Sequence, residues 1–164
     1  EEIKIPAEFH FMAYLTEDML DRFLLLKPKE AIIHIEASEY DKNISLLKRI
    51  TDIGADCGIA ISPDTPPDGL KPYLSYIDTI LVMSRKPGEE NSEFTEEVYG
   101  RIREINKMVE QVKRKIKISV DGGLNSARAA EAAKSGADEV VIGRAFYEEK
   151  DKRRMAEKIH MRTS

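Results

Sequence analysis

Residues 117–147 read KISVDGG, LNSARAAEAAKSGADE and VVIGRAFY, and this stretch decides the fold. Apolar residues alternate up to Asp121, which predicts a buried strand, and the two glycines after it predict a sharp turn. Apolar residues at helical spacing then predict a short helix that Asn125 or Ser126 caps and Gly136 ends. The strand, the turn and the helix are therefore the first part of one strand–helix–strand unit.

The second strand of this unit is the continuous apolar run Val140–Ile142, which ends at Gly143 before Arg144. In parallel α/β folds, ligands bind at the carboxyl ends of the strands. Glycines at those ends, here Gly122, Gly123 and Gly143, let backbone N–H groups approach a phosphate. A short helix that starts near Arg144 would turn its positive end toward the same anion. We therefore expect a phosphate-binding edge.

Composition bounds the class of protein. The chain has 164 residues, which suits a single domain over 1–164, and a formal net charge of −4. That charge argues against nucleic acid or an anionic membrane as a partner. The single cysteine, Cys57, lies in an apolar run, which fits a reduced protein without disulfides. No apolar run reaches membrane-spanning length and residues 1–9 do not read as a signal peptide, so we expect a soluble, cytoplasmic protein.

The same strand–helix pattern recurs six times along the chain. Because the strands read as short apolar runs separated by amphipathic segments, we expect a parallel sheet. Thr16 is the expected cap of the first helix. The expected strands lie at residues 7–12, 31–36, 57–61, 79–83, 117–121 and 140–142. Further helices are expected at about 16–26, 44–53, 70–76, 94–113 and 148–161.

Six short motifs follow one another along the strands and the turns after them. They are FHFM, HIEA, GIAISPDTP, ILVMSRKPG, ISVDGG and GADEVVIGRAF, which together extend from Phe9 to Phe146. In order and spacing they resemble the ribulose-phosphate 3-epimerase family. Each motif alone is weak, because many phosphate-binding barrels share such patterns, but six in register are specific. The resemblance implies an α/β fold of the (β/α)8 TIM-barrel type, of which this chain carries six βα units.

The resemblance also implies roles for particular residues. The histidine of FHFM and the aspartate of VDGG are metal ligands in the family, and these are His10 and Asp121 here. Asp121 is also one of two acid/base carboxylates that act on opposite faces of the substrate. The methionines that cover the reacting carbons correspond to Met12 and Met83. The phosphate glycines correspond to the three named above. Arg144 stands where the family usually has a small residue, and it is a candidate phosphate contact on the chemistry of its guanidinium alone.

The chemistry explains why such residues are needed. Inverting a carbon next to a ketone requires one base to remove a proton and a second acid to return it on the other face. A divalent metal stabilises charge that develops on the oxygens after deprotonation. Imidazole and carboxylate ligands suit zinc, iron or manganese, so we expect one of these if the site is complete and no cofactor otherwise.

The chain also departs from the family pattern. A (β/α)8 barrel needs about 200 residues or more, and the resemblance begins at the family's third strand. Two of four metal ligands and one of two acid/base groups are therefore absent from this sequence. The loop at residues 85–94 keeps only Pro87-Gly88 of the family's closing loop. Either further sequence lies upstream, or the protein is a pared-down relative.

Several of these residues have an ordinary structural interpretation. Strand histidines are commonly hydrogen-bonded core residues, and for His34 the two interpretations are evenly balanced. Met12 and Met83 fit core filling as well as a substrate pocket. Glu36 could orient a ligand or pair with a neighbouring strand, and Arg144 could contact phosphate or form a surface ion pair.

Three functions remain open. The first is a metal-dependent pentose-phosphate epimerase acting on D-ribulose 5-phosphate, and the second is a noncatalytic protein that binds sugar phosphates or a protein partner. The third, a decarboxylase or aldolase-like relative, is weaker because the sequence lacks the Asp-Lys-Asp arrangement of that group. The open edges of an incomplete barrel further predict a homo-oligomer or upstream strands that close it.

Overall fold

The computed structural model describes residues 5–89 and 91–163. Residues 1–4, Glu90 and Ser164 lie outside this range, so the first part of the segment 1–9, which does not read as a signal peptide, is not described. The strands are β1 (Glu8–Phe11), β2 (Glu30–His34), β3 (Asp56–Ile61), β4 (Thr79–Met83), β5 (Lys117–Asp121) and β6 (Glu139–Val141). The α-helices are α1 (Glu17–Leu24), α2 (Tyr40–Asp52), α3 (Glu97–Val109), α4 (Ser126–Lys134), α5 (Arg144–Glu148) and α6 (Lys152–Thr163). Two 3₁₀ helices are η1 (Ile35–Ala37) and η2 (Pro67–Tyr73).

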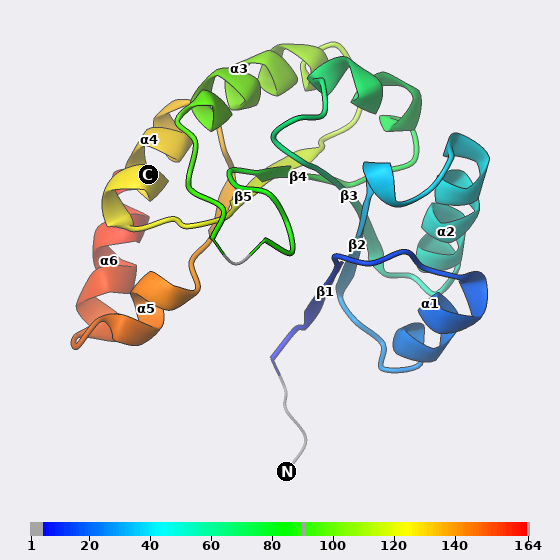
Figure 1. Cartoon of the computed structure of the whole chain (residues 1–164), viewed down its shortest axis with the longest axis horizontal. Helices are drawn as coiled ribbons and strands as arrows, with labels where there is room; N and C mark the ends of the chain where they lie inside the picture. Colours follow the sequence, from blue (N-terminus) through cyan, green and yellow to red (C-terminus); the bar gives the residue numbers. More distant parts are fainter. Residues whose placement is uncertain (1–4, 90, 164) are drawn as a thin grey trace.

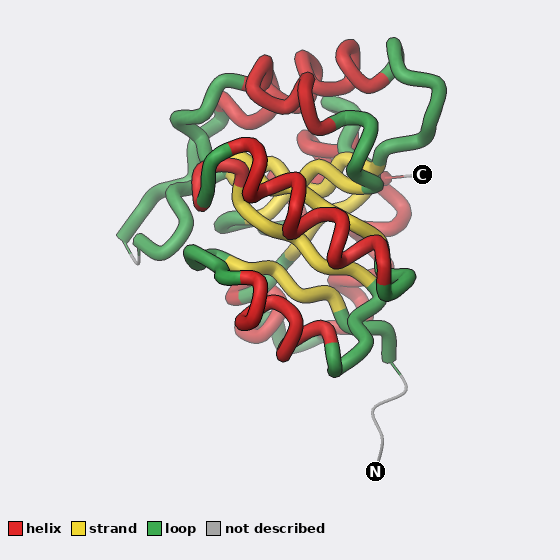
Figure 2. The backbone as a smooth tube through the Cα atoms, turned by 90° about the vertical axis from the view of Figure 1, so that its right-hand side faces the viewer, coloured by secondary structure: helices red, strands yellow, loops and turns green. Residues whose placement is uncertain are grey.

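The six strands form one parallel sheet in the order β1-β2-β3-β4-β5-β6. In Figure 1 the helices form an arc around the strands, from α1 in blue through α3 in green to α6 in red. Figure 2 shows the same strands from the side, with helices along their outer face. Within the described residues β1 and β6 pair with one neighbour each, so the sheet does not close on itself. The predicted parallel sheet of an incomplete barrel is confirmed.

Helix caps follow the sequence closely. Thr16 accepts a hydrogen bond from the Met19 backbone N–H at 3.2 Å and begins α1. Asn125, rather than Ser126, caps α4 by accepting from two backbone N–H groups at 3.0 Å. Gly136 follows α4 with a φ of 106°, a conformation that a side chain would strain. These signals act over a few residues, which is why the sequence predicts them well.

The second strand is shorter than expected at its carboxyl end. It stops at His34 because the chain turns into the 3₁₀ helix η1. The Asn43 side chain holds that turn by donating to the carbonyls of Ile35 and Ser38, at 2.8 and 3.0 Å. The strand thus ends because of a hydrogen bond between Asn43 and Ile35, which are eight residues apart. The apolar run by itself does not predict that hydrogen bond.

Four expected helices also differ from the structure. The helix expected at 44–53 begins earlier, at Tyr40. The helix expected at 70–76 is the 3₁₀ helix η2, which begins at a proline and contains another. The helix expected at 94–113 is the shorter α3. The helix expected at 148–161 begins later, as α6, while the short helix expected near Arg144 is α5, with extended backbone at Glu149 between the two.

The outer face of the sheet packs against the helices. Alternate strand residues such as Ile33, Ile59 and Ile80 enter one large apolar cluster with helix residues, including Leu47 and Ile102. These side chains are fully or almost fully buried. Burying each contributes roughly 1.5–3 kcal/mol of hydrophobic free energy, so this layer is the main source of stability.

The opposite, inner face carries a smaller apolar cluster of Ile32, Ala60, Leu81 and Met83. These residues alternate along the strands with those of the outer cluster, as the two-residue period of a strand requires. All four are almost completely buried. The inner face is therefore a second, thinner core, formed by strand side chains.

Charged side chains lie on the same inner face, at the amino ends of the strands. Lys117 Nζ is 2.8 Å from Glu30 Oε2 and 3.1 Å from Glu139 Oε2. Glu30 is only 4% exposed, and its Oε1 has no hydrogen-bond partner among the described residues. Burial, and secondarily the charge of Glu30, raise the pKa of Glu8 to about 7. An ion pair between the buried Glu30 carboxylate and the partly exposed Lys117 thus joins β2 to β5, and Glu139 on β6 also contacts Lys117.

The helices in residues 5–89 and 91–163 are short or rich in charged residues. None of them combines the length and the apolar character that crossing a bilayer requires.

Candidate functional site

The carboxyl ends of the parallel strands meet at one edge of the sheet, and a cavity of about 510 Å³ lies there. The sequence predicts a role in the site for eight residues, and seven of them line this cavity: Met12, Met83, Asp121, Gly122, Gly123, Gly143 and Arg144. The eighth, His10, does not line it but lies beside Asp121. The fold therefore gathers segments at the ends of β1, β4, β5 and β6 that are distant in the sequence.

His10 and Asp121 face each other across the inner side of the sheet. His10 Nδ1 lies 3.9 Å from Asp121 Oδ2. Burial, and secondarily His34, lower the pKa of His10 to about 4, so the imidazole is neutral at pH 7 and the contact is not an ion pair. Burial raises the pKa of Asp121, while the Gly122 backbone N–H and Arg85 oppose that change.

A neutral imidazole beside a carboxylate is a donor pair that fits a divalent metal. Bonds of about 2.1 Å to each donor would span up to about 4.2 Å, so one ion can reach both His10 Nδ1 and Asp121 Oδ2. The described residues contain no group of three or more histidine, cysteine, aspartate or glutamate side chains that could hold a metal. The described part of the chain therefore offers two ligands, fewer than a closed protein site uses.

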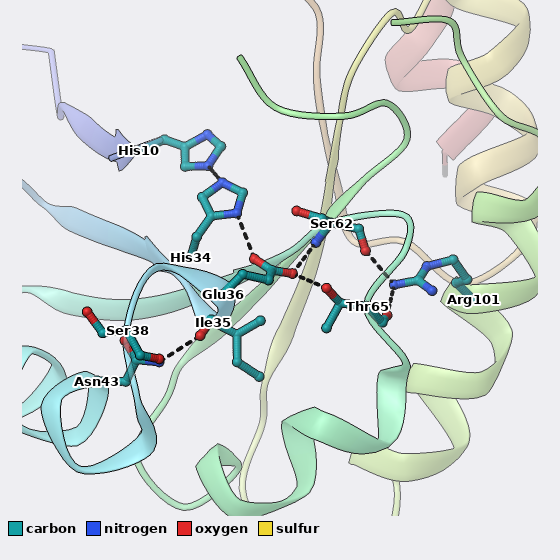
Figure 3. A network of polar contacts seen from close by, with 9 residues as sticks. All are labelled: His10, His34, Ile35, Glu36, Ser38, Asn43, Ser62, Thr65 and Arg101. Carbon is teal, nitrogen blue, oxygen red and sulfur yellow. Dashed lines mark hydrogen bonds and ion pairs between the residues drawn. The ribbon is translucent and has the colours of Figure 1, made fainter. Parts of the chain in front are cut away.

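Behind His10 lies a chain of polar contacts that Figure 3 shows. His10 Nε2 is 2.9 Å from His34 Nε2, and His34 Nδ1 is 3.2 Å from Glu36 Oε2. His34 is only 5% exposed. Its side chain is thus a hydrogen-bonded, buried histidine that lies behind the candidate ligand and contacts it.

Glu36 is held in place by the loop after β3. Its Oε1 accepts hydrogen bonds from the Ser62 backbone N–H at 2.7 Å and from the Thr65 hydroxyl. Arg101 on α3 donates to the carbonyls of both residues, at 3.0 and 2.6 Å. Burial raises the pKa of Glu36, but hydrogen bonds from His34, Thr65 and Ser62 outweigh it and bring this pKa to about 2. The carboxylate is therefore fixed and ionised at neutral pH.

Ser84 joins the ends of β4 and β5 beneath the cavity. Its backbone N–H and its hydroxyl both donate to the Asp121 carbonyl, at 2.8 and 2.9 Å, and the hydroxyl also contacts the Gly122 carbonyl. Gly122 has a φ of 118°, and a Cβ there would lie 2.6 Å from Arg85 Cγ. Sequence reasoning missed Ser84, because its position after a strand is compatible with any polar turn residue.

Basic side chains surround the cavity. Lys86 pairs with Asp64 at 3.0 Å. Arg128 donates to the Gly123 carbonyl and lies 4.1 Å from the centre of the Phe94 ring. Arg144 is exposed and has no ion-pair or hydrogen-bond partner among the described residues. Of the two interpretations of Arg144, the surface ion pair thus finds no support in this part of the chain.

The two methionines differ in surroundings. Met83 is 2% exposed and packs with Ile32, Ala60 and Leu81, so it fills the inner core and also borders the cavity. Met12 is 50% exposed and lies at the cavity wall. Core filling therefore describes Met83 but not Met12.

A curled parallel sheet, helices on its outer face, and a cavity with glycines and a carboxylate at the strand carboxyl ends define an α/β protein of the TIM-barrel type with an incomplete barrel. The model of the ribulose-phosphate 3-epimerase family matches residues 1–147. The chain belongs to this family.

Curated relatives agree with the family. The chain is 33% identical over 146 residues to a ribulose-phosphate 3-epimerase from Mycobacterium bovis, covering 87% of this chain and 62% of that protein. It is 31% identical over 153 residues to the ribulose-phosphate 3-epimerase of Serratia marcescens, covering 93% and 71%. The chain thus spans less than two thirds of the length of the mycobacterial relative.

Solved structures support the fold. A mutant tryptophan synthase α-subunit from Pyrococcus furiosus superposes with a TM-score of 0.67 at 16% identity, covering 94% of this chain and 65% of that one. The BexX/CysO complex of Amycolatopsis orientalis contains a chain that superposes with a TM-score of 0.59 at 18% identity, covering 90% and 60%. At such identities the likeness is one of fold alone.

Proposed function

We propose that this chain carries one half of the site of a pentose-phosphate 3-epimerase whose substrate is D-ribulose 5-phosphate. The observation that carries the proposal is the contact of His10 with Asp121 at the edge of a cavity lined by glycines. Membership of the family and the names of the relatives support the same reaction class. The substrate is thus a phosphorylated sugar, and the proposed location is the cytoplasm.

In the proposed reaction Asp121 removes the proton from carbon 3 on one face of the substrate. Burial raises the pKa of this carboxyl, which makes it a better base than an exposed aspartate. Met12 and Met83 exclude water beside the reacting carbons. His10 and Asp121 would hold zinc, iron or manganese together with ligands from outside this chain, and the ion would supply positive charge next to the substrate oxygens.

The phosphate of the substrate is assigned to Gly122, Gly123, Gly143 and Arg144. Gly123 and Gly143 are exposed at the cavity, whereas the Gly122 N–H contacts the Asp121 carboxylate and would have to turn toward the anion. The guanidinium of Arg144, which has no partner among the described residues, supplies charge and directional donors. Because none of these donors depends on further strands, we expect the chain to bind inorganic phosphate and D-ribulose 5-phosphate weakly. Titration calorimetry with each anion measures this.

A Gly122→Ala substitution tests the assignment. The new Cβ would meet Arg85 Cγ at 2.6 Å and Ser84 Oγ at 2.7 Å, at a φ that strains any side chain. The turn must shift, and losing one hydrogen bond to an anion weakens binding by roughly 10-fold or more. Gly54→Ala is the matched control, because it has a φ of 80° but no atom within 4 Å of the added Cβ. Equal anion affinity in both variants would contradict the assignment.

A noncatalytic function is the second candidate, and one observation favours it. The described residues bring together only two of the four metal ligands and one of the two acid/base carboxylates that the family resemblance implies. A protein that binds sugar phosphates without turning them over would need only the glycine-lined cavity. Phosphate binding without epimerase activity in any assembly of the chain would favour this alternative.

We further propose that another polypeptide segment covers the open edges of the sheet. The outer edges of β1 and β6 expose unpaired backbone groups within the described residues, and such edges attract further strands. The partner is a second copy in a homo-oligomer or upstream residues of the same protein, rather than nucleic acid or a membrane. Light scattering of the dilute 164-residue chain is expected to show a mass above that of a monomer. A stable monomer would contradict the homo-oligomer.

A further inference from the structure

The polar chain behind His10 has a defined direction. Glu36 Oε1 faces the Ser62 backbone N–H, which can only donate, so this carboxylate acts as an acceptor there. Its other oxygen, Oε2, contacts His34 Nδ1 at 3.2 Å. An ionised carboxylate accepts only, so His34 Nδ1 carries the hydrogen of this contact.

The same logic continues to His10. A neutral His34 with its hydrogen on Nδ1 has a lone pair on Nε2, and that atom lies 2.9 Å from His10 Nε2. His10 must therefore donate from Nε2. A neutral His10 with its hydrogen on Nε2 has a lone pair on Nδ1, the atom that lies 3.9 Å from Asp121.

We propose that Glu36 and His34 are positioning residues that hold His10 in the Nε2–H tautomer, so that its Nδ1 lone pair faces Asp121. This inference rests on the proposed function in one respect, namely that the tautomer presents His10 Nδ1 as a ligand to a metal. The tautomer itself is a property of the chain without any metal or substrate.

The reverse arrangement fits the distances less well. It would place the hydrogen of His10 on Nδ1, facing Asp121 Oδ2 at 3.9 Å, which is too long for a hydrogen bond. It would also leave His34 Nδ1 and Glu36 Oε2 as two acceptors facing each other at 3.2 Å. With both imidazoles neutral, only the forward direction gives each of the two contacts one donor and one acceptor.

The surroundings hold this relay of His10, His34 and Glu36 in place. Arg101 fixes the loop that carries Ser62 and Thr65, and these two residues fix Glu36. Asn43 fixes the η1 turn that joins His34 to Glu36. Outer groups that orient a metal-binding histidine commonly change metal affinity 10–100-fold when they are removed, so we expect an effect of about that size here.

The direct test is nitrogen-15 NMR of the imidazole rings in the metal-free chain, which contains three histidines. We expect His10 to carry its hydrogen on Nε2 and His34 to carry its hydrogen on Nδ1. A hydrogen on His10 Nδ1 in the unmodified chain would overturn the proposal, whatever the chain binds or catalyses. Failure of the proposed function would instead appear as absent phosphate binding with the tautomers unchanged.

Glu36→Gln reverses the relay in a predictable way. The Ser62 N–H keeps the amide oxygen on its side, which turns the amide NH₂ toward His34 Nδ1. His34 then donates from Nε2, and His10 is forced to carry its hydrogen on Nδ1. We expect this tautomer change together with a roughly 10–100-fold loss of Zn²⁺ affinity, measured by competition with a chromophoric chelator.

Two further variants complete the experiment. Glu36→Asp retains the carboxylate and is expected to keep the original tautomers. If only the length of the Glu36 side chain mattered, this shorter side chain would change them. Glu131→Gln changes an exposed carboxylate on α4, which pairs with Lys134, and should alter neither readout. If Glu36→Gln folds with the original tautomers and Zn²⁺ affinity, the relay is wrong. If Glu36→Gln does not fold, the tautomers of the unmodified chain and of Glu36→Asp decide.

Discussion

The 164-residue chain alone is expected to epimerise D-ribulose 5-phosphate at least ~10²-fold more slowly than a full-length family member, because one acid/base group usually contributes at least that factor. In the proposed reaction Asp121 removes the proton on one face of the substrate. The second acid/base carboxylate that the family resemblance implies belongs to a strand outside the six described here. The comparison protein can be the ribulose-phosphate 3-epimerase of Serratia marcescens, of which this chain covers 71%.

The measurement is a coupled assay for D-xylulose 5-phosphate with added Zn²⁺ or Mn²⁺. Any residual turnover should disappear in Asp121→Asn, which cannot accept the proton. Asp68→Asn is the control, because this exposed aspartate pairs with Lys71 at the surface. Turnover equal to that of the full-length relative, abolished by Asp121→Asn, would show that this chain contains or assembles a complete site.

Lys117→Met is expected to lower the free energy of unfolding by about 3–5 kcal/mol, the usual effect of leaving a buried charge, here that of Glu30, without its partner. Glu30 is almost fully buried, and one of its oxygens already lacks a partner in the described residues. Without Lys117 Nζ at 2.8 Å, its charge has nothing to offset the loss of water. Glu139 adds further negative charge nearby, and Glu8, whose pKa is about 7, adds a partial charge at that pH.

Urea unfolding at pH 7 measures this change. Lys134→Met is the matched control, because its ion pair with Glu131 is exposed and removing it should cost less than about 1 kcal/mol. The double variant Glu30→Met with Lys117→Met should recover most of the loss, since apolar pairs often replace buried ion pairs at little cost. An effect of Lys117→Met no larger than that of the control would mean that the pair contributes nothing.

Local sequence signals predicted the elements of this fold. Each of the six strands lies where an apolar run was expected, and Thr16 and Asn125 cap the helices that they were expected to begin. Such signals depend on contacts within about four residues, so the sequence contains them directly. The ends of α3 and the start of α6 were predicted less accurately. Loop contacts, such as the hydrogen bond from the Thr95 N–H to the Ser84 carbonyl, influence where helices begin.

The gathering of the site residues was also predictable in outline. Parallel strands end at one edge of a sheet, so Met83, Asp121 and Gly143 had to lie near one another. The resemblance to a family added His10 to this set, and the structure places it beside Asp121. The catalytic and ligand roles of these residues stay predictions.

What the sequence by itself determined is therefore the order of the elements, the parallel sheet and the edge at which the site lies. Only the tertiary structure decided which side chains meet across that sheet. His10 and His34 are 24 residues apart and Glu30 and Lys117 are 87 apart, and in each case the two side chains come from different strands. Strand periodicity assigns each of these residues to a face, but the curl of the sheet sets which residues on that face touch.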